Sequence, residues 1–477
     1  MPAPDVQRRY PLAPLQHGML FQALLAPGSG VNVEQAVCRL RQGVDAERLE
    51  QAWARVIARH DVLRTRFRWD DVPERVQEVL AGVTVPLAVD DWSRLGAGER
   101  DARLERWLAE DRARGFDLGR APALRLALFR MAADEHVLVW TFHHVLLDGT
   151  SVGHVLREVF TLYDAADAVL PERRPFHEHV ARLRGRDAAD DVAYWGARFR
   201  GFGGAERVRG IRRAPRDPAA EPVAGDRELL LSAADTGALR AFEGERGVWL
   251  NTLVQGAWAL LLGRYTGAAE AVFGVVRGGR GGVEGAEEMV GLLINTVPVR
   301  VPLPPDARVT DWLEEIGART AALHPHEHAA LADIRQWSGI PSDTELFDTV
   351  LNFQPRPFDA HLRALGGPWN ARSFRILRHP GLPLTLEVTA GERLRARMHY
   401  DAERFDAQAI DRMLGHFAGL LRAMADAPDA PLSRLPLGGA EERAALVDAG
   451  RAQRTFAVTE RIEERFARRA AERPDAP

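Results

Sequence analysis

The chain has 477 residues, of which 46% are hydrophobic and 27% are charged, and its formal net charge is −4. This length exceeds one ordinary hydrophobic core and predicts at least two lobes. The composition excludes a disordered chain and a basic nucleic-acid-binding domain, and no secretory or membrane-spanning stretch is evident, so we expect a cytoplasmic protein without nucleic-acid or membrane partners.

Apolar spacing predicts two helices and three strands in the first part of the chain. The helices span residues 45–60 and 151–165, and the strands span residues 62–69, 123–131 and 136–142. A short polar connection separates the last two strands, which therefore predict a hairpin.

A second set of elements follows a segment rich in Gly, Pro and Arg at residues 201–226, which we interpret as an exposed excursion near a lobe boundary. The predicted helices span residues 251–265 and 406–425, and the predicted strands fall at 271–276, 296–301, 347–354 and 382–400. Beyond residue 427 the pattern changes to a Pro-rich linker and a charged amphipathic helix at 460–472.

The run His143-His144-Val145-Leu146-Leu147-Asp148-Gly149 follows an almost wholly apolar strand. Histidine is the side chain whose ordinary pKa suits proton transfer at neutral pH. Neighbouring strand residues face opposite sides, so one histidine is expected to be structural and the other to face a cleft. A buried Asp148 needs a cationic partner, and Arg64 is the best candidate.

Two other interpretations of these histidines stay open. They are either satisfied core residues at a strand end, or metal ligands together with Asp148. The histidines at positions 324, 326 and 328 form a second cluster. The chain has no His-Glu-x-x-His or paired-Cys spacing, so we expect no metal site.

The run His143-His144-x-x-x-Asp148-Gly149 resembles the signature of the condensation domains of nonribosomal peptide synthetases, which are related to chloramphenicol acetyltransferase. Three further segments resemble that family in the same order, at residues 10–21, 59–65 and 289–296. The resemblance covers roughly residues 8–430. Residues 458–477 are similar to the start of an adenylation domain.

The resemblance implies an α/β fold of two acetyltransferase-like lobes in a V, with mixed sheets flanked by helices and an active-site tunnel between the lobes. The implied parts are an N-terminal lobe at 1–175, a C-terminal lobe at 176–430, and a linker with the start of an adenylation domain at 431–477. The loop at residues 277–288 would form the tunnel floor, and the segment near 355–373 would cross between the lobes as a latch.

By the same resemblance, His144 is the catalytic histidine. Its structural support comprises His143, Asp148, Gly149 and Arg64, the last as the partner of Asp148. The candidates for the tunnel or acceptor pocket are Thr150, Ser151, Asn295 and Asn352. Thr150 stands where many relatives carry tryptophan. The smaller threonine would widen the acceptor side of the tunnel.

The implied activity is acyl transfer: amide formation between a donor thioester on one carrier protein and an acceptor amine on another. Phosphopantetheine arms come with the carriers, no cofactor is expected to be permanently bound, and the chain is expected to be monomeric beside an adenylation domain. One alternative is a stand-alone or ester-forming enzyme that takes a diffusible alcohol or amine. Another is a non-catalytic platform that recruits carriers and partners.

Overall fold

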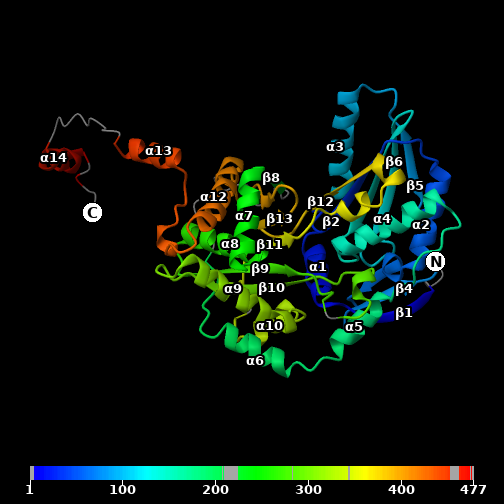
Figure 1. Ribbon diagram of the computed structural model, residues 1–477, viewed down its shortest axis with the longest axis horizontal. Helices are drawn as coiled ribbons and strands as arrows, with labels where there is room; N and C mark the ends of the chain where they lie inside the picture. Colours follow the sequence, from blue (N-terminus) through cyan, green and yellow to red (C-terminus); the bar gives the residue numbers. More distant parts are fainter. Residues whose placement is uncertain are drawn as a thin grey trace.

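The computed structural model describes residues 5–206, 208, 224–281, 283–341, 344–451, 461–472 and 474. Two large β-sheets, each flanked by helices, and a small three-stranded sheet organise this part of the chain (Figure 1). We call the surroundings of the five-stranded sheet and the small sheet lobe 1, and those of the six-stranded sheet lobe 2. The predicted mixed α/β fold is confirmed, whereas residues 207 and 209–223 of the predicted excursion lie outside the described residues.

Lobe 1 contains eight strands and four main helices. Its strands are β1 (Val6–Pro11), β2 (Val33–Leu40), β3 (Thr65–Arg68), β4 (Val76–Leu80), β5 (Leu87–Asp91), β6 (Leu124–Ala132), β7 (Glu135–His143) and β12 (Arg372–Leu377), and its helices are α1 (Pro14–Leu25), α2 (Ala46–Arg59), α3 (Ala97–Ala113) and α4 (Gly149–Asp164). The large sheet has the order β12-β2-β7-β6-β5, and the small sheet has the order β1-β4-β3.

Strand β7 is apolar along most of its length because both faces of its sheet are covered. Leu138 and Trp140 belong to the cluster that contains α2 and α4 residues, while Val137 and Val139 belong to a cluster with Leu104 of α3. The predicted hairpin is confirmed by the antiparallel pairing of β6 with β7.

The strand predicted at residues 62–69 is wrong over its first part. The chain forms a 3-10 turn at Asp61–Arg64, and β3 begins only at Thr65. The turn is closed by a hydrogen bond from the Leu63 amide to the His60 carbonyl, and Arg64 pairs with Asp61 three residues earlier.

Lobe 2 is built on a six-stranded sheet of order β10-β9-β11-β13-β14-β8. The strands are β8 (Ala224–Leu230), β9 (Glu270–Arg277), β10 (Asn295–Pro302), β11 (Thr349–Gln354), β13 (Leu384–Thr389) and β14 (Arg395–Asp401). The helices are α6 (Ala189–Arg198), α7 (Ala233–Arg246), α8 (Leu250–Thr266), α9 (Val309–Leu323), α10 (Leu331–Trp337) and α12 (Ala407–Asp426). Two short helices that follow lobe 1 in the sequence, α5 (Phe176–Arg184) and α11 (Ala360–Arg363), bury Phe176, Val180 and Leu362 in the lobe 1 core.

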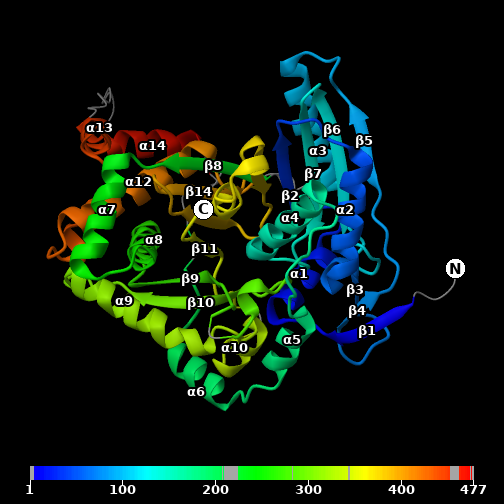
Figure 2. The ribbon, with the colours of Figure 1, turned by 45° about the vertical axis from the view of Figure 1, so that its right-hand side comes forward.

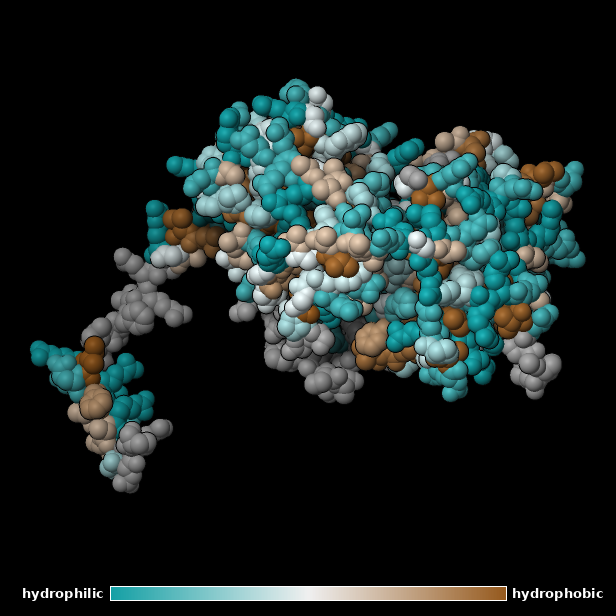
Figure 3. Space-filling view, turned by 90° about the horizontal axis from the view of Figure 1, so that it is seen from below, coloured by the Kyte–Doolittle hydropathy of each residue, from teal (hydrophilic) through white to brown (hydrophobic). Residues whose placement is uncertain are grey.

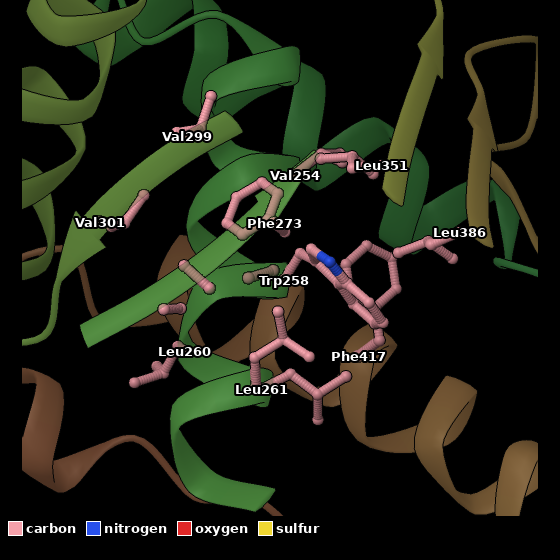
Figure 4. Packing of buried hydrophobic residues seen from close by; sticks show 14 of the residues in the cluster. Val254, Trp258, Leu260, Leu261, Phe273, Val299, Val301, Leu351, Leu386 and Phe417 are labelled. Atoms are coloured by element: carbon pink, nitrogen blue, oxygen red, sulfur yellow. The ribbon is translucent and has the colours of Figure 1, made fainter. Parts of the chain in front are cut away.

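Helix α8 is the centre of the lobe 2 core. Its residues are almost all buried because the sheet, α9 and α12 surround it. Trp258 of α8 lies between Phe273 of β9 and Phe417 of α12, as Figure 4 shows. The continuous apolar run that predicted this helix therefore reflects burial on every side.

Two segments from the second half of the sequence pack into lobe 1. Strand β12 pairs antiparallel with β2 over six residues, from Arg372 opposite Leu40 to Leu377 opposite Gln35. Met289 and Leu293, from the loop between β9 and β10, are buried in the lobe 1 core. The lobes diverge from the region of α1 and α5 (Figure 2) and are held together by these crossing segments.

Two terminal helices, α13 (Ala440–Arg451) and α14 (Ile462–Glu472), contain no buried residue. Figure 3 shows a mainly hydrophilic face of the two lobes, with hydrophobic residues scattered over it. Among the described residues, no helix is both long and apolar enough to span a bilayer.

Candidate active site

The histidine run forms the turn between β7 and α4. The Asp148 carboxylate caps α4 by accepting a 2.8 Å hydrogen bond from the Ser151 amide. The His144 amide donates to the Asn32 carbonyl at 2.7 Å, and Gln16 of α1 donates to the Val145 carbonyl at 2.9 Å. The buried strand, the cap and these two contacts fix the backbone of the turn.

His144 has one ring nitrogen committed and one available. Its Nδ1 lies 2.6 Å from the Leu147 carbonyl oxygen. Since a carbonyl oxygen only accepts, Nδ1 carries the proton, and Nε2 of the neutral ring holds a free lone pair. The side chain is 18% exposed and lines a cavity, so Nε2 is placed to accept a proton.

His143 lies in a different environment from His144, in keeping with the alternation of strand residues. It is 2% exposed, and its Nδ1 accepts a 3.1 Å hydrogen bond from the Val145 amide. Burial, with a smaller contribution from His144, lowers the pKa of His143 to about 3. A neutral, enclosed imidazole supports the turn and is not placed for proton transfer.

Asp148 pairs with Arg280, which lies in the loop after β9. Nη2 of Arg280 is 2.7 Å and 2.9 Å from the two carboxylate oxygens, and the Leu293 amide donates to Oδ2 at 3.0 Å. Burial alone would raise the pKa of Asp148, but Arg280 and the amides of Ser151 and Leu293 hold it below its ordinary value. The ion pair therefore ties the loop from lobe 2 to the histidine turn.

The predicted pairing of Arg64 with Asp148 is wrong. The Arg64 guanidinium contacts Gln7 at 2.7 Å, the Leu80 carbonyl at 2.6 Å and Asp61 at 2.8 Å. The 3-10 turn aims this side chain at the small sheet β1-β4-β3, away from the histidine turn.

A cavity of about 640 Å³ adjoins His144. Its walls come from α1, β2, β11, β13 and the segment at 378–382, and its lining includes His144, Glu34, Asn295, Asn352, Arg378 and Glu387. Asn295 is anchored, because its amide donates to the carbonyls of Glu327 at 2.9 Å and Ala329 at 2.8 Å. A volume of this size is typical of sites for small organic ligands.

Thr150 and Ser151, predicted as pocket residues, do not line this cavity. Thr150 is exposed in the first turn of α4. Ser151 is completely buried, and its hydroxyl bonds the Gly291 carbonyl at 2.7 Å and Arg280 at 2.9 Å. Gly149 is half-buried, and a Cβ there would lie 3.7 Å from the Arg378 guanidinium.

Sequence reasoning missed Arg280, Arg378, Glu34 and Glu387. Arg280 contacts a residue 132 positions earlier, so no local pattern reveals the pair. Glu34 did carry a signal, because a carboxylate inside the mostly apolar run 31–40 is unusual. In the described part of the chain, no cluster of three or more His, Cys, Asp or Glu could hold a metal ion.

Comparison with known proteins gives consistent matches. The family model described as "Condensation domain" matches residues 6–447. Linear gramicidin synthase subunits D and B of Brevibacillus parabrevis are 34% and 36% identical over 99% and 92% of this chain. The chain spans only 10% and 8% of the lengths of these two relatives.

Solved structures share the fold. The first condensation domain of the calcium-dependent antibiotic synthetase, in complex with a substrate analogue, has a TM-score of 0.73 at 21% identity, with 90% of this chain and 100% of that chain covered. A four-domain nonribosomal peptide synthetase bound to AMP and glycine has a TM-score of 0.80 at 16% identity, with 100% of this chain and 37% of that chain covered.

Proposed function

The chain belongs to the condensation-domain family of nonribosomal peptide synthetases, and on that premise we propose that it joins a donor thioester on one carrier protein to an acceptor amine on another. The observation that carries the proposal is the free Nε2 lone pair of His144, which lines a cavity of about 640 Å³. The two phosphopantetheine arms would bring donor and acceptor into this cavity.

His144 acts as the proton acceptor in this scheme. The amine nitrogen attacks the thioester carbonyl carbon, so that a C–N bond forms and the C–S bond breaks. Nε2 takes the proton that leaves nitrogen and passes it to sulfur, which departs as the thiol of the donor arm. Asp148, Arg280 and His143 hold the turn in place and do not touch the reacting atoms.

Positioning supplies much of the acceleration. An α-amine has a pKa of about 7.7–8, so a useful fraction is already neutral near pH 7. Holding amine and thioester at reacting distance lowers the barrier by as much as ~7–11 kcal/mol in ideal cases. General base catalysis adds a factor of roughly 10²–10⁴.

The segment at 431–477 is proposed to be a linker followed by the start of an adenylation domain, and the lobe boundary is placed at residues 175/176. The absence of buried residues from α13 and α14 supports this proposal from residue 440 onward, whereas Leu432 and Leu435 are buried in the lobe 2 core. The multidomain size of the relatives supports the same proposal.

The test loads one carrier with a donor and a second with an aminoacyl acceptor, and follows the acceptor by intact mass. We expect the condensed product from the wild-type chain, and a loss of roughly 10²-fold or more with His144→Ala. The control is His416→Ala on α12, because His416 bonds Tyr265 and Glu442 outside the cavity. Turnover by His144→Ala at the wild-type rate would contradict the assigned role, and absence of product from the wild type would favour the recruiting platform.

A further inference from the structure

A carboxylate lies beside the working nitrogen of His144. Glu34 of β2 is 2% exposed, and its Oε1 is 3.7 Å from Nε2 of His144. Both residues line the cavity. An atom about 2.9 Å from each, an ordinary hydrogen-bond distance, fits between two acceptors at this spacing.

Glu34 belongs to an ion-pair array that crosses between the lobes. Oε1 of Glu34 is 3.4 Å from Nε of Arg378, whose Nη1 bonds Glu387 of β13. One guanidinium is therefore shared by two carboxylates, which leaves the array with one uncompensated negative charge. Burial would lower the pKa of Arg378, but Glu387 and Glu34 raise it, so the guanidinium stays charged.

The neighbouring groups do not supply the missing positive charge. Arg397, opposite Glu387 in the ladder, is engaged by Asp226 at 2.8 Å and 2.9 Å. Burial lowers the pKa of His379 to about 4 and also lowers that of His399, which keeps both rings neutral near pH 7. On the cavity side, Oε1 of Glu34 faces Nε2 of His144 at 3.7 Å.

We propose that Glu34 binds the acceptor nitrogen jointly with His144, which makes the site selective for amines over alcohols. The inference rests on the proposed function. An arriving ammonium completes the charge of the array. One of its protons leaves to solvent by way of Nε2 of His144, which returns to its neutral form before the attack, while another N–H donates to Oε1 of Glu34.

The same contact stabilises the reaction itself. When the nitrogen attacks the thioester carbon it becomes positively charged, and Glu34 lies beside that charge until His144 removes the next proton and passes it to the departing sulfur. A hydroxyl acceptor has a single proton. If that proton goes to His144, the oxygen lone pairs face Glu34 without a hydrogen bond, which disfavours alcohols.

The experiment compares an aminoacyl-loaded acceptor carrier with the same carrier loaded with the matching α-hydroxy acid. The wild type should prefer the amine by at least tenfold in kcat/KM. Glu34→Gln should raise KM for the amine acceptor roughly 10–100-fold, the range expected for a lost charge-assisted hydrogen bond. It should leave KM for the donor carrier and the hydroxy-acid reaction nearly unchanged, so that the amine preference falls.

Two further variants separate binding from folding. Glu34→Asp keeps the charge and should restore part of the amine preference. Glu78→Gln removes another buried carboxylate held between two arginines, Arg9 and Arg66, outside the cavity, and should leave both acceptors unaffected.

The outcomes distinguish failure of the proposed condensation function from failure of the role proposed for Glu34. Failure of the wild-type chain to condense loaded carriers overturns the proposed function. A wild-type chain that forms amides while Glu34→Gln slows both acceptors equally overturns the inference alone. If Glu34→Gln fails to fold by circular dichroism, the wild-type comparison decides, because equal kcat/KM for the two acceptors also overturns the inference.

Discussion

The side chains of the histidine run have different roles in the site. His144 presents a lone pair to the cavity, while Asp148 and Arg280 form a buried ion pair behind it, 1% and 7% exposed. A buried carboxylate and its cation are tolerated only as a pair, because either one alone would be a buried charge that has lost its hydration and has no partner.

Arg280→Gln should lower the free energy of unfolding by about 3–5 kcal/mol, the usual cost of leaving a buried charge unpaired. Arg280 also donates to the carbonyls of Ala286 at 2.6 Å and Met289 at 2.9 Å, so the loop loses its anchor as well. Urea denaturation at pH 7 measures the difference from wild type.

Arg64→Gln is the matched control for that change. Arg64 pairs with Asp61, whose side chain is 24% exposed and regains water when the cation is lost. The expected loss is therefore smaller than for Arg280→Gln. An Arg64 variant that costs as much as the Arg280 variant would contradict the assignment of Arg280 as the partner of Asp148.

The sequence allowed prediction of the histidine turn but not of its partners. The order of residues in the run, together with the apolar strand before it, is local information. The choice between Arg64 and Arg280 depends on where loops from different lobes meet. The sequence alone does not indicate which arginine lies close to Asp148. Thr150 points outward and Ser151 points inward because of the rotational orientation of α4 about its axis. The short signature motif does not indicate this orientation.

Helices and the hairpin were predictable at the level of elements because their periodicity is local. Residues 45–60 and 251–265 have their counterparts in α2 and α8, and the β6–β7 hairpin follows its polar connection. The short strand β12 lacks such a signal, since its pairing partner β2 lies more than 300 residues earlier. The 3-10 turn before β3 was missed because a four-residue turn carries too few positions for a period.

Gly279 is one of the glycines that fix the path of the loop between β9 and β10. Gly279 has φ +64°, and a Cβ there would lie 1.9 Å from the Leu293 carbonyl oxygen. Gly279→Ala should destabilise the fold by at least about 1–3 kcal/mol, the cost of a strained backbone position, and should slow condensation because the loop carries Arg280.

The adjacent Gly278→Ala isolates this effect. A Cβ at residue 278 meets nothing within 4 Å. Its expected change is within about 0.5 kcal/mol, as for ordinary surface substitutions. Differential scanning calorimetry of both variants measures the contrast, and equal melting temperatures would count against the tight path at Gly279.

At the scale of the whole molecule, two separate cores are linked by polar contacts and crossing segments. The Asp148–Arg280 pair, the array around Arg378 and the β2–β12 ladder all join lobe 1 to residues from the second half of the sequence. The site lies where these links meet, so its geometry depends on the relative placement of the lobes.

Acid should destabilise the folded chain. Burial lowers the pKa of His143 and of His179, each 2% exposed, to about 3 in the folded state. Between the ordinary histidine pKa of about 6.5 and pH 3, these two histidines bind protons in the unfolded chain but not in the folded chain. Their stabilising effect is complete above pH 6.5 and is lost as the pH falls toward 3.

Melting temperatures measured from pH 8 to pH 5 at constant ionic strength test this expectation. The wild-type value should fall below pH 6.5, and each histidine contributes a slope of about 1.4 kcal/mol per pH unit in the free energy of unfolding. His179→Gln should reduce that slope. A melting temperature that stays level from pH 8 to pH 5 would show that the buried rings do not stay neutral.

Strand β12 also sets the order of events during synthesis. The edge of β2 facing β12 has no partner until residues 372–377 emerge, more than 300 residues after β2 itself. At 5–20 residues per second, a ribosome takes roughly 15–70 s to make that stretch. For that time the nascent lobe exposes an open sheet edge, which is the kind of surface that chaperones cover and that drives aggregation when they do not.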